Sequence, residues 1–436
     1  MGVDVLFRAR GVGFPVRVSG FLACVALSAC GSSLSPLTGG RSDSGMDATF
    51  SDAPSDTRRA DARVADALID APTASRCPPW DGSNAIITPM ASLTVSGDQG
   101  STFGISDPSL VWPAGSADGY VSFTSLENTG LFTRVAKTSD GTSFTYVGDA
   151  NASSDVMVQT TDSSVCGAAT CPGRMVHETS ALVDDPGDPD ASRRFKLFDY
   201  TYVIVPTAMH PHQNTWGYIG LYTAQAPEMG WSSGTKAIGW SSTADSVSTT
   251  GAATVASTVS ALQDCQAFTE PAGLVDPARG TLYLALGCQT AASARAVLLQ
   301  STDHAATFSY VGVLLSAADG TSLGSASPGL MPSDFFQSGG ATYLIASTLG
   351  TTPTVANAPS GYTSCTTVLV DDLASAFVHR DDAGDPVAIR RLVAPSGGFA
   401  GACSFKPQFA SGYLVDEVVG EGPVPNLIIP SGVVCP

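Results

Sequence analysis

The sequence predicts an all-β protein, and three observations support this. Short runs rich in Val, Tyr, Phe and Thr are bounded by Gly, Ser, Asp and Pro, which is typical of strands and tight turns. No stretch beyond residue 76 sustains the periodicity of a helix. A phrase that joins an acidic residue and a proline to an apolar strand recurs along the chain. Such repeats are typical of β-propellers, and their spacing predicts five blades, with six as the alternative.

The first 76 residues are expected to lie outside this fold. Residues 1–29 combine arginines with a short apolar run, which indicates a secretory signal peptide. Residues 27–30, LSAC, resemble the lipobox of bacterial lipoproteins. The resemblance implies acylation of Cys30, attachment to the lipid bilayer, and an outer-membrane or cell-surface location; an ordinary signal peptide ending in Cys is the alternative. Residues 30–76 are rich in Ala, Ser, Asp and Gly and predict a disordered tether.

The predicted propeller domain, residues 77–436, is strongly acidic. The chain carries a net charge of −18, and the charges of the signal peptide and the tether cancel. Such a surface disfavours nucleic acids and other polyanions and favours a neutral or cationic ligand. Among the histidines, His210 and His212 form an HPH pair without a third ligand, so we expect neither a metal nor a cofactor.

The cysteine pattern is consistent with export. Apart from Cys30 and one cysteine in the signal peptide, an even number remains, which indicates disulfides in an exported chain. Closure of a propeller by its two chain ends predicts one disulfide between Cys77 and Cys435. The other expected pairs are Cys166–Cys171, Cys265–Cys288 and Cys365–Cys403.

Two hairpins share a second motif. RVAKTSDGTSFTYVG at 134–148 and AVLLQSTDHAATFSYVG at 296–312 each place an aspartate in a tight turn between two strands. The motif resembles the Asp-box hairpin of propeller blades. Asp140 and Asp303 are therefore expected to accept hydrogen bonds from turn amides and to have a structural role.

The recurring phrase positions acidic residues. SDPSLVWPAGSADGYVSFTS at 106–125 is echoed at 269–287 and 327–347, more loosely from 178, and in shortened form from 405. Alignment of the copies predicts that Asp107, Glu178 and Glu270 occupy one structural position in three successive blades. Ser327 and Lys406 take that position in the last two blades. Since innermost strands line the central channel, the three carboxylates are expected to face one cavity.

This pattern resembles the five-bladed glycoside hydrolases of the arabinanase and β-xylosidase families and, more distantly, the invertase and levansucrase families. The resemblance implies that Asp107 is the base or nucleophile and Glu270 the general acid. Glu178 would tune and orient the acid, but it is Glu rather than Asp and lacks a following proline. Asp184 or Asp185 is therefore an alternative for this middle role.

Glycosidic cleavage requires two carboxyl groups in different protonation states, and crowding of acids raises the pKa of the least solvated one. Trp112 and Trp216 are candidates for stacking on a sugar, with packing between blades as the alternative. The predicted function is hydrolysis of a neutral glycan. A non-catalytic carbohydrate-binding or scaffold propeller is the alternative. A sialidase-like hydrolase ranks last, because no arginine occupies the entrance position of an innermost strand.

Overall fold

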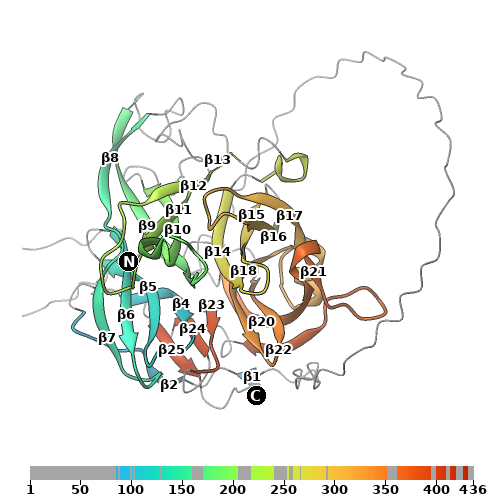
Figure 1. Cartoon of the computed structure of the whole chain (residues 1–436). Coiled ribbons are helices and arrows are strands. Elements are labelled where there is room, and N and C mark those ends of the chain that lie inside the picture. Colours follow the sequence, from blue (N-terminus) through green and yellow to red (C-terminus); the bar gives the residue numbers. More distant parts are fainter. Residues whose placement is uncertain are drawn as a thin grey trace, which may run out of the picture.

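The computed structural model describes residues 85–86, 89–98, 101, 104–127, 130–159, 170–204, 218–239, 253–254, 259–265, 267–290, 293–350, 361–393, 399–408, 413–418 and 426–430. Nearly all regular structure in these ranges is β-strand, in a β-propeller arrangement (Figure 1). Helix is confined there to α3 (Ala317–Ser322) and three 3-10 turns. The all-β prediction is confirmed. No helix among these residues is long and apolar enough to cross a membrane.

Four sheets, I to IV, are each built on four consecutive antiparallel strands. Sheet I contains β4 (Gly104–Val111), β5 (Gly119–Glu127), β6 (Gly130–Thr138) and β7 (Phe144–Asp149), with β3 (Val95–Ser96). Sheet II contains β9 (Thr170–Asp184), β10 (Phe195–Ile204), β11 (Tyr218–Ala224) and β12 (Thr235–Gly239), with β8 (Ser154–Gln159) and β13 (Ala253–Thr254). Sheet III contains β14 (Ala267–Asp276), β15 (Thr281–Gln289), β16 (Ala294–Ser301) and β17 (Ser309–Leu315). Sheet IV contains β18 (Leu330–Ser338), β19 (Ala341–Leu349), β20 (Tyr362–Asp372) and β22 (Ala388–Val393), with β1 (Ala85–Ile86) and β21 (Phe377–Val378).

Sheet V differs from the others because it joins the two ends of the described chain. It consists of β23 (Phe399–Phe405), β24 (Tyr413–Val418) and β25 (Asn426–Pro430), completed by β2 (Pro89–Ser92). Four blades of consecutive strands are therefore present among the described residues, fewer than the five or six expected from the repeat. The difference arises because the last sheet takes one strand from the beginning of the chain.

The first strand of each sheet faces a common centre (Figure 1). These strands contact one another in cyclic order: β4 with β9, β9 with β14, β14 with β18, β18 with β23, and β23 with β4. Side chains at corresponding places on these strands are therefore brought together although they are far apart in the sequence.

The apolar core lies between adjacent sheets. One cluster joins sheets II and III and includes Phe198 and Phe268, and another joins sheets III and IV and includes Tyr283 and Phe335. Smaller clusters fill the interfaces of sheets IV and V and of sheets I and II. Both faces of most strands are thus buried, which explains their near-continuous apolar runs.

Serine side chains connect neighbouring sheets at the centre. The Ser109 hydroxyl accepts a hydrogen bond from the Leu182 amide at 2.8 Å, which joins sheet I to sheet II. The Ser404 hydroxyl accepts from the Leu110 amide at 3.0 Å, which joins sheet V to sheet I. Each bond satisfies a buried amide, which would otherwise destabilise the fold.

Two expected disulfides, Cys265–Cys288 and Cys365–Cys403, are confirmed. Cys171 is also disulfide-bonded. Cys77, Cys166 and Cys435 lie outside the described residues, so the pairs expected for them stay predictions.

The aspartates of the two repeated turns bind backbone amides as expected. Asp140 Oδ1 accepts from the amides of Thr142 at 2.8 Å and Ser143 at 2.7 Å. Asp303 Oδ1 accepts from the Thr307 amide at 2.8 Å. Both side chains thus hold turns together, which agrees with a structural role.

Candidate active site

Two β-bulges fix the positions of Asp107 and Glu270. The bulge in β4 contains Asp107 and Pro108, and the bulge in β14 contains Glu270 and Pro271. Both acidic residues have left-handed backbone, with φ of 52° for Asp107 and 48° for Glu270. This conformation costs about 1–3 kcal/mol for a residue other than glycine and is often retained at functional sites.

The alignment of the last two blades was wrong. In sheet IV the bulge falls at Ser333, and in sheet V it contains Ala402, which has φ of 45°. Ser327 lies before β18, and Lys406 lies after β23. The prolines used to align these copies stand outside the innermost strands, so they did not mark the bulge.

Glu178 lies on β9 and, unlike Asp107 and Glu270, is not part of a bulge. Glu178 pairs with Tyr200 in β10. The bulge of β9 falls two residues later, at Ser180, which has no paired residue in β10. The Glu178 side chain is buried, and Tyr202 donates a hydrogen bond to its Oε1 at 2.7 Å.

Asp107, Glu178 and Glu270, which we call the central trio, influence one another electrostatically. Burial raises the pKa of Glu178 well above its ordinary value, and the nearby charges of Asp107 and Glu270 raise it further against the opposing hydrogen bond from Tyr202. Burial also raises the pKa of Asp107 from 3.8 to about 6, partly offset by hydroxyl groups that include Ser106 at 2.9 Å. Glu178 is therefore close enough to both other carboxyl groups to be affected by their charges.

Tyrosines surround the central trio. Tyr362 from β20 donates to Glu270 Oε1 at 3.0 Å, and the rings of Tyr200 and Tyr202 stack at 4.8 Å with 29° between their planes. Burial raises the pKa of Tyr200, and so do the charges of Glu178 and Glu270. These tyrosines were not among the residues predicted from the sequence. The Tyr-x-Tyr pattern in the strand paired with Glu178 was the one available signal.

The central trio differs from an ion-pair cluster. Among the described residues, no lysine or arginine contributes to the pKa of Asp107 or Glu178. The acids instead face hydroxyl groups, which donate hydrogen bonds without neutralising charge.

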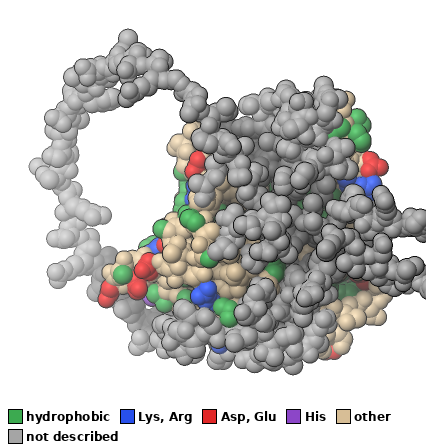
Figure 2. Space-filling model, turned by 180° about the vertical axis from the view of Figure 1, so that it is seen from behind, with side chains coloured by type: hydrophobic (Ala, Val, Ile, Leu, Met, Phe, Trp, Pro, Cys, Tyr) green, Lys and Arg blue, Asp and Glu red, His purple; other side chains and the backbone are tan. Residues whose placement is uncertain are grey.

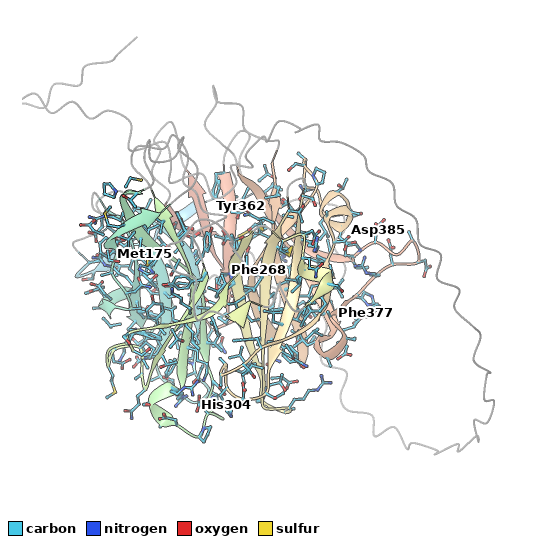
Figure 3. The ribbon with its side chains drawn as sticks, turned by 90° about the horizontal axis from the view of Figure 1, so that it is seen from above. Met175, Phe268, His304, Tyr362, Phe377 and Asp385 are labelled. Atoms are coloured by element: carbon cyan, nitrogen blue, oxygen red, sulfur yellow. A yellow bond between two sulfur atoms is a disulfide. The ribbon has the colours of Figure 1, made fainter. Side chains whose placement is uncertain are left out.

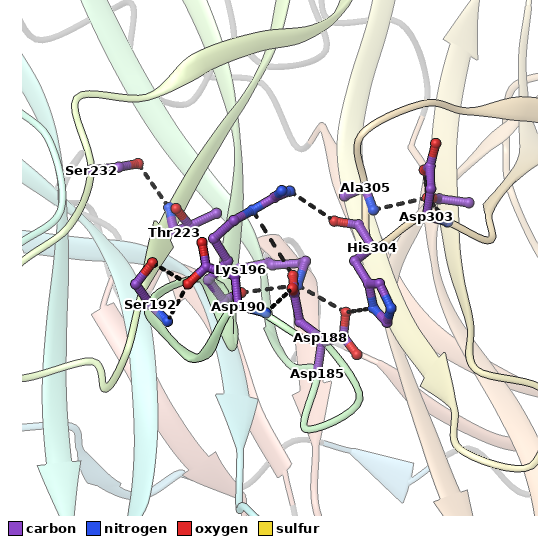
Figure 4. Close-up of polar contacts among 12 residues, drawn as sticks. Asp185, Asp188, Asp190, Ser192, Lys196, Thr223, Ser232, Asp303, His304 and Ala305 are labelled. Atoms are coloured by element: carbon purple, nitrogen blue, oxygen red, sulfur yellow. Dashed lines mark hydrogen bonds and ion pairs between the residues drawn. The ribbon is translucent and has the colours of Figure 1, made fainter.

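The alternatives for the middle role, Asp184 and Asp185, belong to other interactions. Asp184 receives two hydrogen bonds from Arg194, at 2.6 and 2.9 Å. Asp185 Oδ2 lies 2.8 Å from Lys196 Nζ and 2.9 Å from His304 Nδ1 (Figure 4). In Figure 3, His304 lies at the bottom of the molecule, and Tyr362 lies well above it. Asp184 is the last residue of the strand that carries Glu178, and Asp185 follows it, so both aspartates lie beyond Glu178 at the end of that strand.

Asp185, Asp188 and His304 are spaced closely enough to hold a metal ion. However, the buried Lys196 ammonium already contacts both aspartates, at 2.8 and 2.9 Å. We call Asp185, Asp188, Lys196 and His304 the lysine network. The Lys196 ammonium thus already supplies a positive charge to the two aspartates that would bind a metal ion.

Trp112 packs within its own hairpin. Its Nε1 donates to the Ser116 carbonyl at 3.1 Å, and its ring covers Gly119 so closely that a Cβ there would lie 2.4 Å from it. These contacts favour the packing alternative over sugar stacking. Trp216, His210 and His212 lie outside the described residues.

The surface adds little to this description. On the face shown in Figure 2, acidic and basic side chains of the described residues appear as scattered spots rather than as one extended patch.

Several solved structures are similar to this chain, with low sequence identity. An exo-1,5-α-L-arabinanase from a bovine ruminal metagenomic library is 12% identical, with a TM-score of 0.42. The match covers 74% of this chain and 92% of the arabinanase chain. A family 117 glycoside hydrolase from Zobellia galactanivorans is 12% identical, with a TM-score of 0.43 and coverage of 80% and 92%. An endo-arabinase from Bacteroides thetaiotaomicron is 12% identical, with a TM-score of 0.44 and coverage of 81% and 99%.

No protein-family model matches the sequence, and none of the curated proteins matches it. The site is therefore interpreted from its own geometry.

Proposed function

We propose that this protein is a glycoside hydrolase that cleaves a neutral glycan at the central trio. One observation supports the proposal: burial raises the pKa of Glu178, and the charges of Asp107 and Glu270 from the two neighbouring sheets raise it further. Glycoside hydrolysis needs paired carboxyl groups of which one is protonated and one is ionised. Structural acids are normally neutralised by cations, whereas these face hydroxyl groups.

Each acid has a distinct role in this proposal. Glu270 transfers its proton to the leaving oxygen as the glycosidic C–O bond breaks. Asp107 is ionised and acts as base toward water or as nucleophile toward the anomeric carbon. Glu178 lies between them in blade order and tunes the acid, because the mutual repulsion of crowded carboxylates keeps at least one of the three groups protonated. The matching bulges give Asp107 and Glu270 the same backbone geometry in two sheets that flank sheet II.

Sheet V completes the site in this proposal as a fifth blade. The cyclic contacts of the innermost strands support this, because β23 contacts both β18 and β4. Its strand β2 from the beginning of the chain would close the ring and hold sheets I and IV at fixed positions. The lipid anchor at Cys30 and the outer-membrane location remain part of the proposal and rest on the sequence.

The test is hydrolysis of arabinan, xylan, fructan and mannan fragments by the purified protein. Asp107→Asn and Glu270→Gln are each expected to lower kcat by about 10²–10⁴-fold, the usual contribution of a general acid or base. The acidic limb of kcat/KM is expected near pH 6, because Asp107 must be ionised and its pKa is about 6.

Glu228→Gln is the matched control, since Glu228 accepts a hydrogen bond from Tyr120 outside the central trio. Folded variants at Asp107 and Glu270 that keep the parental rate would refute the assignment. A parent protein that binds these glycans without cleaving them would instead establish the non-catalytic carbohydrate-binding alternative.

A further inference from the structure

Tyr362 contacts the central trio from sheet IV. Its hydroxyl lies 3.0 Å from Glu270 Oε1, and both residues are buried, with exposures of 2% and 7%. Burial raises the pKa of Tyr362, and the charges of Glu270, Asp107 and Glu178 raise it further. The phenol therefore keeps its proton and donates it in this hydrogen bond.

The ring of Tyr362 is held in place from sheet V. A Cβ added at Gly401 would lie 2.4 Å from the ring, so this glycine permits the close approach of β23. Phe399 packs against the same ring, with centroids 5.5 Å apart. The disulfide Cys365–Cys403 joins β20 to β23 a few residues away. These contacts fix the direction in which the hydroxyl points.

We propose that Tyr362 is a positioning residue for Glu270, which selects the oxygen that carries the transferable proton. This inference rests on the proposed function. The phenol occupies Oε1, so the acidic proton resides on Oε2. When the Oε2–H bond breaks, the proton passes to the leaving oxygen and Glu270 becomes a carboxylate. The hydrogen bond to Oε1 strengthens as this charge develops, so it stabilises the transition state more than the ground state.

Among the described residues, Glu178 from β9, Tyr200 from β10 and Tyr362 from β20 interact electrostatically with Glu270, and Asp107 from β4 interacts with Glu178 and Tyr362. The phenol of Tyr362 donates a hydrogen bond to Glu270 at 3.0 Å. Removal of this donor is expected to raise the pKa of Glu270, because a hydrogen bond donated to a carboxylate favours its ionised form.

The experiment compares Tyr362→Phe with the parent in two independent measurements. The first is the pH titration of glutamate side chains by ¹³C NMR, in the full chain labelled at Glu. The sequence has few glutamates to assign: Glu127, Glu178, Glu228, Glu270, Glu417 and Glu421. Glu270→Gln identifies the signal of interest. Tyr362→Phe is expected to move its midpoint to higher pH by about one unit.

The second measurement is the pH profile of hydrolysis. Tyr362→Phe is expected to lower kcat by roughly 10- to 100-fold with little change in KM, as for a displaced catalytic group. The alkaline limb of kcat/KM should move to higher pH in parallel with the NMR midpoint. A loss of packing alone would lower the rate without moving that limb.

Tyr120→Phe is the matched control, because Tyr120 also donates to a glutamate, Glu228, at 3.1 Å. It should leave both the Glu270 midpoint and the rate unchanged. A Glu270 midpoint that does not respond to Tyr362→Phe overturns the inference, whether or not the protein turns over. A parent that hydrolyses nothing refutes the proposed function, while the NMR midpoint still decides whether Tyr362 controls the ionisation of Glu270.

Discussion

The central trio and the lysine network both contain buried carboxyl groups, but different groups face them. In the lysine network the ammonium of Lys196, which has no exposed surface, contacts Asp185, Asp188 and the Arg193 carbonyl within 2.9 Å. In the central trio the acids face hydroxyl groups and one another.

The pKa values follow this difference. Burial acts to raise the pKa of Asp188, but Lys196, the Asp190 amide and Arg193 outweigh it and lower the pKa. Burial raises the pKa of Asp107 to about 6, and no cation opposes it. A carboxylate with an internal counter-ion stabilises a fold, whereas one without a counter-ion destabilises it and is able to exchange protons near neutral pH. The comparison therefore separates an acid group paired with an internal cation from the acid group of the proposed active site.

The largest effect is expected from removal of the cation of the lysine network. Lys196→Met leaves two buried carboxylates without their partner, which typically costs about 3–5 kcal/mol. Urea unfolding at pH 7 measures the loss. The triple variant Lys196→Met, Asp185→Asn, Asp188→Asn removes the unpaired charges and should recover much of the stability. Equal stability of the single variant and the parent would show that the network is solvated.

A smaller effect of opposite sign is expected from Asp107→Asn. Since the folded-state pKa is raised from 3.8 to about 6, ionisation of Asp107 is disfavoured in the fold. The resulting stability is present below about pH 4 and is lost as the pH rises through about 6. Asn stays neutral and tolerates left-handed backbone, so the variant should gain up to about 3 kcal/mol at pH 7.5 and almost nothing at pH 4.

Asp188→Asn provides the contrast for this measurement. Its folded-state pKa is lowered, so the stability that its ionised form contributes is present above about pH 4 and is lost as the pH falls. The variant should therefore be less stable than the parent at pH 7.5, and the difference should shrink in acid. If both substitutions shift stability in the same direction at pH 7.5, the electrostatic distinction between the two groups is wrong.

The smallest effect concerns the bulge in sheet V, where Ala402 has left-handed backbone without any carboxylate. Ala402→Gly relieves about 1–2 kcal/mol of backbone strain and adds a smaller entropy cost of about 0.5–1 kcal/mol, so a net gain of about 0.5 kcal/mol is expected. Ala400→Gly in the same strand should instead lose about 0.5–1 kcal/mol. A loss at both positions would mean that the left-handed bulge is not a strained feature of the propeller.

Some features of this protein were determined by local sequence. Alternation of β-formers with turn residues predicts strands, because side chains on a pleated strand repeat every two residues. The Asp-Pro and Glu-Pro phrases identified Asp107 and Glu270, since a proline in an innermost strand is tolerated at a bulge. Two disulfides were also predicted correctly, Cys265–Cys288 and Cys365–Cys403.

Other features depended on tertiary structure. The partners of the central trio, Tyr202 and Tyr362, approach through strand pairing and through contact between sheets. Tyr202 belongs to a local Tyr-x-Tyr pattern, whereas Tyr362 leaves no local signal. The choice of Glu178 over Asp185 was decided in the same way, because only folding places Lys196 against Asp185 and leaves Glu178 without a cation. Local sequence fixes which residues can form a bulge or a strand. The charge state of a buried acid depends on the side chains that long-range contacts bring to it.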